Sequence, residues 1–177
     1  MASGMPRIAW AMCCLAVLVM AGTYMLNPFD ADSLDPRERI AGYGIYRVPG
    51  AAMAPAIGAG QIVFSDVGYY RAHVPQRGDV VVVRVPGNGM RVIKRIVGLP
   101  GETVSIRDGI VEIDGRDLSE PHVAEATATT PYSREMTPFL VPQNAYFVLG
   151  DNRDGSEDSR TWGAIARNDL QARVLGR

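Results

Sequence analysis

The feature that most constrains this sequence is an uncharged apolar run near its beginning, from Ile8 to Leu26. In a helix that rises 1.5 Å per residue, this run would cover roughly 28 Å, close to the thickness of a bilayer core. A cleaved signal peptide is the competing interpretation, because Arg7 precedes the run and the small residues Ala21 and Gly22 lie inside it. Apolar residues continue beyond this pair and no Ala-x-Ala site follows, which favours a retained single-pass membrane helix.

Charges on either side of the run predict its orientation. Arg7 and the α-amino group precede it, whereas aspartates dominate the stretch that follows. The basic flank of a membrane helix normally stays in the cytoplasm. We therefore expect residues 1–26 to form an anchor with a cytoplasmic N-terminus, residues 27–39 to form a linker, and the rest of the chain to lie outside the cytoplasm.

The remaining residues, 40–177, have the pattern of a mainly β domain. Short β-branched runs bounded by glycine and proline predict strands at 61–64, 79–85, 91–97, 103–106, 110–113 and 146–149. A three-residue turn is expected at 107–109, with Gly109 where a positive φ would fall. Helical periodicity is confined to 168–174. Residues 116–140, rich in threonine and proline, predict a mobile excursion.

Composition excludes several classes of function. The chain has 18 basic and 19 acidic residues and a net charge of −1, so it offers no broad basic surface for nucleic acid. Its two histidines, His73 and His122, are far apart in sequence, and its two cysteines, Cys13 and Cys14, are adjacent. Neither pattern predicts a metal site or a disulfide framework. Any catalytic chemistry would therefore come from serine, lysine and carboxylates.

Lys94 is the single lysine among the 18 basic residues. Arginine stays charged, whereas a buried lysine can lose its proton and act as a base. On an alternating strand Lys94 shares a face with Val92 and Ile96, which would desolvate its ammonium group and lower its pKa. The competing interpretation is a lysine that extends to solvent from a half-exposed strand.

A second polar signal follows the last expected strand, at residues 150–163, which read GDNRDGSEDSRTWG. A solvated loop is the ordinary interpretation of such a segment. The spacing of Asp158, Arg160 and Trp162 also suits an ion-paired loop packed under an aromatic ring.

Three motifs carry a family resemblance: RGDVVV at 77–82, KRIVGLPGE at 94–102 and GDNRD at 150–154. In this order, and behind an N-terminal anchor, they resemble the bacterial type I signal peptidases over the anchor and nearly all of residues 43–165. The resemblance implies a membrane-anchored serine endopeptidase with a Ser/Lys dyad and a largely antiparallel β fold. Maturation peptidases of conjugative pilus systems belong to the same superfamily, but the motifs as written favour the general secretory branch.

The resemblance also implies a location and partners. Enzymes of this family remove signal peptides from exported proteins on the outer face of the membrane. They use no metal or other cofactor and no catalytic histidine. The expected partners are therefore signal peptides and the lipid bilayer of the bacterial cytoplasmic membrane, and not nucleic acid or a metal ion.

The family's functional residues match the following positions in this sequence. Lys94 matches the general base, and Ser156 matches the serine that hydrogen-bonds and orients it. Asp158 and Arg160 match a supporting ion pair, and Asp151 lies in the same loop.

The resemblance implies that the substrate binds as an extended strand along 46–49 and 91–93, a case of β-augmentation. Its shallow pockets would accept alanine one and three residues before the cut. The residues that match the pocket walls are Val48, Pro49, Met53, Ile57, Val92 and Ile93.

The sequence departs from the family at the nucleophile. Met53 and Pro55 fix the alignment and put Ala52 where the family has its attacking serine. Gly50 replaces a second serine, whose hydroxyl helps to bind the oxyanion. A methyl group cannot attack a carbonyl carbon, so the usual acyl-enzyme route is closed in this alignment.

Three interpretations of Ala52 stand side by side. It is an engineered replacement of serine, or the chain is a natural non-catalytic relative that binds signal peptides or exported proteins, or another nucleophile acts. No serine or threonine occurs between Ser33 and Ser65, and Ser156 is the hydroxyl expected beside Lys94. An engineered change would hardly also remove the hydroxyl at Gly50, and this weighs against the first interpretation.

Overall fold

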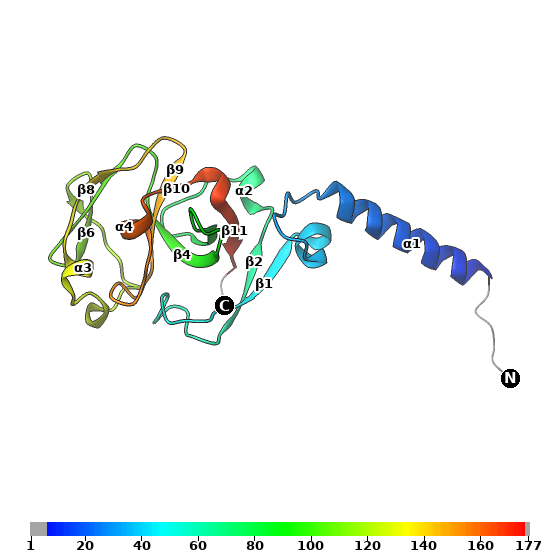
Figure 1. Ribbon diagram of the computed structural model, residues 1–177, viewed down its shortest axis with the longest axis horizontal. Coiled ribbons are helices and arrows are strands. Elements are labelled where there is room, and N and C mark those ends of the chain that lie inside the picture. Colours follow the sequence, from blue (N-terminus) through cyan, green and yellow to red (C-terminus); the bar gives the residue numbers. More distant parts are fainter. Residues whose placement is uncertain (1–6, 176–177) are drawn as a thin grey trace.

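The computed structural model describes residues 7–175. The first six residues of the expected anchor, with the α-amino group, and the last two residues of the expected β domain lie outside the described residues. The first element, α1 (Arg7–Leu26), extends away from the β-sheets as a separate rod (Figure 1). Its segment Ile8–Leu26 is long and apolar enough to cross a membrane, and none of it is buried against the rest of the chain. Anchoring by this helix therefore stays a prediction.

The larger sheet has the strand order β1-β2-β11-β3-β4-β9-β10, and neighbouring strands are antiparallel. Its strands are β1 (Tyr43–Arg47), β2 (Ile62–Asp66), β11 (Leu170–Val174), β3 (Val80–Arg84), β4 (Arg91–Gly98), β9 (Ala145–Leu149) and β10 (Ile165–Ala166). The valines of β3 contact apolar clusters on both faces of this sheet: Val81 and Val83 pack with Ile96 and Val148, whereas Val80 packs toward Met53. Burial on both faces explains why β3 is a continuous valine run.

The smaller sheet lies at the end of the molecule farthest from α1 (Figure 1) and has the order β7-β6-β5-β8. Its strands are β7 (Arg116–Asp117), β6 (Ile110–Ile113), β5 (Thr103–Arg107) and β8 (Met136–Leu140). One apolar cluster joins the two sheets, since Val104 and Ile106 of β5 pack with Phe147 and Leu149 of β9. The fold is therefore mainly β and antiparallel, behind one N-terminal apolar helix, as the sequence predicts.

Short helical turns connect the strands. They are η1 (Arg37–Ala41), α2 (Tyr69–Ala72), η2 (Glu125–Thr127), α3 (Pro131–Arg134), α4 (Ser159–Trp162) and η3 (Arg167–Asp169). The six strands expected from β-branched runs all form, as β2, β3, β4, β5, β6 and β9.

The expectation of a helix at 168–174 is wrong, because these residues form the end of η3 and strand β11. Leu170 and Ala172 are buried and alternate with more exposed polar residues, which is the two-residue period of a strand. The expected three-residue turn is also wrong. Arg107 pairs with Ile110, so the turn is the two residues Asp108 and Gly109, both with positive φ, as in a type I′ hairpin.

The segments expected to be a linker and a mobile excursion contain helical turns and strands. The expected linker, 27–39, includes the start of η1, where Glu38 is only 4% exposed. The expected excursion, 116–140, contains β7, η2, α3 and β8, and β8 pairs with β5.

Asp154 attaches the excursion to the 150–163 loop. Its carboxylate accepts hydrogen bonds from the backbone N–H and hydroxyl of both Thr129 and Thr130, at 2.7–3.1 Å, and from the hydroxyl of Ser133. These donors, the Ser133 hydroxyl above all, hold the pKa of Asp154 well below its usual range.

Replacing Asp154 by alanine is therefore expected to release the segment 127–134. Limited proteolysis should cut it severalfold faster than in the unmodified chain, whereas Asp117→Ala, at an exposed position in β7, should leave the rate unchanged. Because the pKa of Asp154 is lowered by folding, its contribution is complete above the usual carboxyl pKa and is lost only as the pH falls through the lowered value. Protection that already disappears at about pH 4, near the ordinary value, would contradict this account.

Candidate active site

Lys94 lies in the middle of β4 and is 3% exposed. It pairs in register with Val81, and its ammonium group donates a hydrogen bond to the Oγ atom of Ser156 at 3.0 Å. The ring of Trp162 lies 5.8 Å from its Nζ atom. Burial lowers the pKa of Lys94, and the negative charge of Asp158 opposes this shift without reversing it. The amine is thus placed and tuned as a proton acceptor requires.

Ser156 is held from several directions. Its backbone carbonyl accepts hydrogen bonds from the guanidinium group of Arg160 at 3.1 Å and from the hydroxyl of Tyr132 at 3.3 Å. Gly150 makes room for it, since a Cβ atom there would collide with the Ser156 side chain and lie 2.5 Å from the carbonyl oxygen of Ala52. Close approach of three segments therefore requires glycine at this position.

Asp158 and Arg160 form a fully buried ion pair with two hydrogen bonds of 2.8 Å each. Asp158 is also the N-cap of α4 and accepts a hydrogen bond from the backbone N–H of Gly150 at 3.0 Å. The pair therefore joins the end of β9 to the start of α4 and fixes the loop that carries Ser156. The guanidinium group of Arg160 also stacks on the ring of Tyr132, 4.1 Å from the ring centroid.

Asp151 binds Arg95 and not Lys94. Its two carboxylate oxygens accept hydrogen bonds from the guanidinium group at 2.8 and 2.7 Å. Since Arg95 points to the opposite face of β4 from Lys94, Asp151 holds β4 from the face opposite to the amine. His122 lies 3.7 Å from the same carboxylate, and burial lowers the pKa of this histidine.

Ala52 lines a pocket of about 190 Å³ together with Lys94 and Gly50. The backbone around Ala52 is tied to the 150–163 loop by Asn152. The N–H of Asn152 donates to the carbonyl of Ala52 at 3.1 Å, and its side-chain amide donates to the carbonyl of Ala51 at 3.2 Å. The structure therefore brings together Ala52, Lys94 and Ser156, although only the last two carry functional groups.

Five of the six expected wall residues line this pocket, namely Val48, Pro49, Met53, Val92 and Ile93. Ile57 does not. It packs beneath the pocket against Val48, Met53 and Val63 and lines a neighbouring cavity of about 440 Å³.

The pocket lies between two strand edges. Residues 91–95 of β4 pair with β3, whereas β9 pairs with β4 only from Arg95 onward. Across the pocket lie residues 46–53, which are the end of β1 and the segment that follows it; β1 pairs with β2. Four antiparallel steps separate β1 from β4, so the two strands run in the same direction. An extended peptide that lies between them can therefore form the same type of strand pairing, parallel or antiparallel, with both.

Sequence reasoning missed three residues of the site: Gly150, Asn152 and Tyr132. Gly150 and Asn152 belong to the GDNRD motif, so the motif itself was a signal for them. Tyr132 lies in the segment expected to be a mobile excursion, and no local pattern in the sequence indicated it. Among residues 7–175 no group of three or more histidine, cysteine, aspartate or glutamate residues is arranged to hold a metal ion.

Comparison with known proteins identifies the family. The profile described as "Signal peptidase, peptidase S26" matches residues 37–177. The chain is 33% identical to a probable signal peptidase I of Synechocystis over 138 residues, which are 73% of this chain and 68% of that protein. It is 34% identical to signal peptidase I of Bacillus licheniformis over 122 residues, 65% of this chain and 64% of that protein. The chain therefore spans about two thirds of the length of these relatives.

A solved structure agrees. The chain is similar to the crystal structure of a signal peptidase I from Enterococcus faecalis, with 39% sequence identity and a TM-score of 0.50. The match covers 58% of this chain and 97% of that chain. A mainly β antiparallel fold is thus shared with this class of protein. The chain belongs to the family of type I signal peptidases, and the family resemblance of its motifs is confirmed.

The tight fit at Gly150 predicts a selective loss of stability. Gly150→Ala should lower the free energy of unfolding by about 1–3 kcal/mol, because the new methyl group must displace Ser156 or Ala52. Gly58→Ala is the matched control, since a Cβ atom there meets nothing within 4 Å. Denaturant unfolding of both variants measures the difference, and equal stabilities would show that the site tolerates the extra atom.

Burial of Lys94 predicts a pH-dependent effect on stability. Lys94→Met should stabilise the folded chain near neutral pH by about 1–3 kcal/mol, because the amine no longer has to be desolvated. Since folding lowers the pKa of Lys94, the unfolded chain binds more protons, and the stability of the unmodified chain rises with pH toward the ordinary lysine pKa of about 10.4. The advantage of methionine should shrink over this range.

Thermal unfolding of the two chains across this pH range tests the prediction. Arg116→Met, which removes an exposed cation in β7, is the control. A stabilisation by methionine that stays constant with pH would contradict the prediction.

Proposed function

We propose that this chain works in signal-peptide processing, as a signal peptidase I-like membrane endopeptidase site for exported proteins. The observation that carries the proposal is Lys94, a buried amine with a lowered pKa at the edge of an apolar groove between two strands that run in the same direction. In this role the neutral amine accepts the proton of the attacking group, and Ser156, Asp158 and Arg160 hold the amine in place.

The shape of the groove supports small side chains near the cut. Its walls are the apolar residues Val48, Met53 and Ile93, and its volume of about 190 Å³ is small. In an extended peptide, residues two apart point to the same side. A pocket of this kind therefore selects small residues one and three positions before the cut, which is an Ala-x-Ala type site.

The apolar helix supports a membrane location. In the proposal, residues 1–26 anchor the chain in the bacterial cytoplasmic membrane, 27–39 link the anchor to the body, and 40–177 form the domain outside the cytoplasm. The partners are the lipid bilayer and the signal peptides of exported proteins, and the chemistry requires no metal or other cofactor.

Ala52 favours a second candidate function, binding without cleavage. A methyl group at the position of the attacking hydroxyl removes the acyl-enzyme route, and Gly50 lacks a hydroxyl for the oxyanion. The groove and the Lys94–Ser156 hydrogen bond are intact in the same chain. Such a chain would hold a signal peptide and leave it whole. Cleavage by the chain as it stands would need another nucleophile, and Ser156 is the hydroxyl that contacts Lys94.

One experiment separates these functions. The full-length chain in detergent is given a signal-peptide substrate with an Ala-x-Ala site, and both binding and cleavage are measured for the unmodified chain, Ala52→Ser, Lys94→Ala and Ser156→Ala. We expect Ala52→Ser to raise the cleavage rate by about 10³-fold or more, because it restores a hydroxyl beside the base. The double variant Ala52→Ser with Lys94→Ala should lose this gain.

The unmodified chain then decides between the candidates. Cleavage that disappears in Lys94→Ala and in Ser156→Ala supports peptidase activity through another nucleophile. Binding without cleavage supports the peptide-binding candidate. If the unmodified chain neither binds nor cleaves and Ala52→Ser stays inert, both candidates are wrong.

A further inference from the structure

Glu38, in η1, is 4% exposed and has three partners. Its carboxylate accepts hydrogen bonds from the hydroxyl of Ser33 at 2.5 Å, from the hydroxyl of Tyr46 at 2.8 Å and from the guanidinium group of Arg91 at 3.1 Å to each oxygen. A carboxylate is removed from water at a large cost unless it is paired in this way. Arg91 donates a further hydrogen bond to Tyr46, at 3.2 Å, so the three groups form one network.

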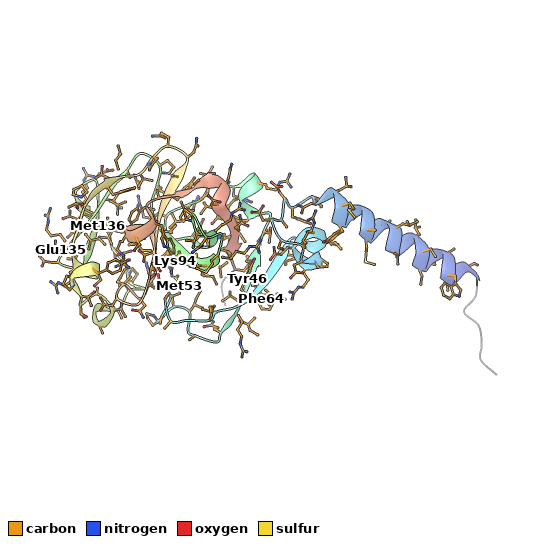
Figure 2. All side chains as sticks on the ribbon, in the orientation of Figure 1. Tyr46, Met53, Phe64, Lys94, Glu135 and Met136 are labelled. Atoms are coloured by element: carbon orange, nitrogen blue, oxygen red, sulfur yellow. The ribbon has the colours of Figure 1, made fainter. Side chains whose placement is uncertain are left out.

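Two members of this network line the groove from opposite sides. Tyr46 is on β1 and Arg91 is on β4, and both contribute to the pocket that holds Ala52 and Lys94. Glu38 therefore bridges the two strand edges between which a peptide would lie. Figure 2 shows that Tyr46 lies nearer to α1 than Lys94 does, so the bridge is at the end of the groove that faces the apolar helix.

The bridge is also attached to α1. Arg39, the next residue of η1, donates a hydrogen bond to the backbone carbonyl of Tyr24 at 3.1 Å, and its guanidinium group lies 4.7 Å from the centroid of the Tyr24 ring. The hydroxyl of Tyr24 donates to the carbonyl of Leu34 at 3.1 Å. These contacts place Glu38 where a peptide segment that leaves a membrane beside α1 would enter the groove.

We propose that Glu38 determines specificity at this entrance: by neutralising Arg91 it makes the α1-side end of the groove accept an uncharged, apolar peptide segment and disfavour an acidic one. This inference rests on the proposed function and adds to it the chemistry of the segment before the cleavage site.

Charge arithmetic explains why the groove needs Glu38. Arg91 is always protonated, and besides Glu38 and Tyr46 its side chain contacts the neutral oxygen of Gln171 at 3.3 Å. Burial and the Glu38 carboxylate raise the pKa of Tyr46 to about 12, so Tyr46 stays a neutral donor. Arg47 also lines the groove, but it is exposed and screened by solvent. Without Glu38, therefore, one partly desolvated cation would remain at the entrance.

The register of the groove locates the affected peptide position. Arg91 precedes Lys94 by three residues on a strand, about 10 Å along the groove. For a peptide whose earlier residues lie toward α1, the residue opposite Arg91 is thus three residues before the one opposite Lys94. For a peptide that ends in Ala-x-Ala at Lys94, this is the residue directly before that motif.

The test uses two peptides that differ at this residue. Both end in Ala-Gln-Ala after an apolar run, and the residue before this motif is leucine in one and aspartate in the other. Their dissociation constants are measured with the full-length chain in detergent. For the unmodified chain we expect the leucine peptide to bind about tenfold more tightly, since an unpaired carboxylate is costly in the groove.

Two variants should move this ratio in opposite directions. Glu38→Gln should abolish the preference or reverse it, and high salt should weaken its binding of the aspartate peptide, because the new attraction is ionic. Arg91→Gln leaves the Glu38 charge unpaired and should increase the preference for leucine. The matched control is Asp108→Asn, which removes a carboxylate bound to the exposed Arg134, outside the groove.

A positioning or folding role alone would give a different result. If Glu38→Gln weakens both peptides equally, or leaves the ratio unchanged, the proposed specificity role is wrong. If Glu38→Gln does not fold, an unchanged ratio in Arg91→Gln is enough to overturn it. If the unmodified chain binds neither peptide, the peptide-binding function fails as well, which the three other outcomes would not imply.

Discussion

The hydrogen bond between Lys94 and Ser156 is the interaction on which the rest of the site depends. A lysine that is 3% exposed is costly unless its amine has a partner or loses its proton. The structure supplies both solutions: Ser156 accepts its hydrogen bond, and burial lowers its pKa. The Asp158–Arg160 pair, the glycine at 150 and the stacking on Tyr132 all act on the loop that carries Ser156. Their common effect is to keep one hydroxyl beside one amine.

The sequence predicts those parts of this arrangement whose residues lie close together along the chain. Lys94 lies in a strand that its β-branched neighbours predict, and Ser156 and Asp158 lie in a polar loop directly after another predicted strand. The helix expected at 168–174 failed because a seven-residue segment fits both periodicities, and pairing with β2 and β3 decides for a strand. The Glu38 bridge could not be predicted, because Arg91 is 53 positions away and the contact exists only once the sheet has formed.

The same packing explains how the chain keeps its fold without a hydroxyl at position 52. The contacts of Ala52 that fix the site are made by its backbone, whose carbonyl accepts a hydrogen bond from Asn152. Serine and alanine share this backbone and the Cβ atom. The groove walls, the buried amine and the ion pair therefore do not depend on which of the two residues is present. In this chain binding and chemistry are separable, and the retained lysine is compatible with either proposed function.

The two basic residues at the ends of the β4 edge show why one is lysine and the other arginine. An apolar peptide in the groove would meet a charge at both ends unless each charge were removed. Lys94 can lose its proton, and its burial favours that loss. Arg91 cannot lose its proton, so its charge has to be balanced by a carboxylate, and Glu38 supplies it from outside the sheet. At the candidate catalytic end burial shifts the proton equilibrium of Lys94 toward the neutral amine, and at the end that faces α1 an ion pair balances the charge of Arg91. Because only the first mechanism yields a base, exchanging the two residues would leave the groove without one.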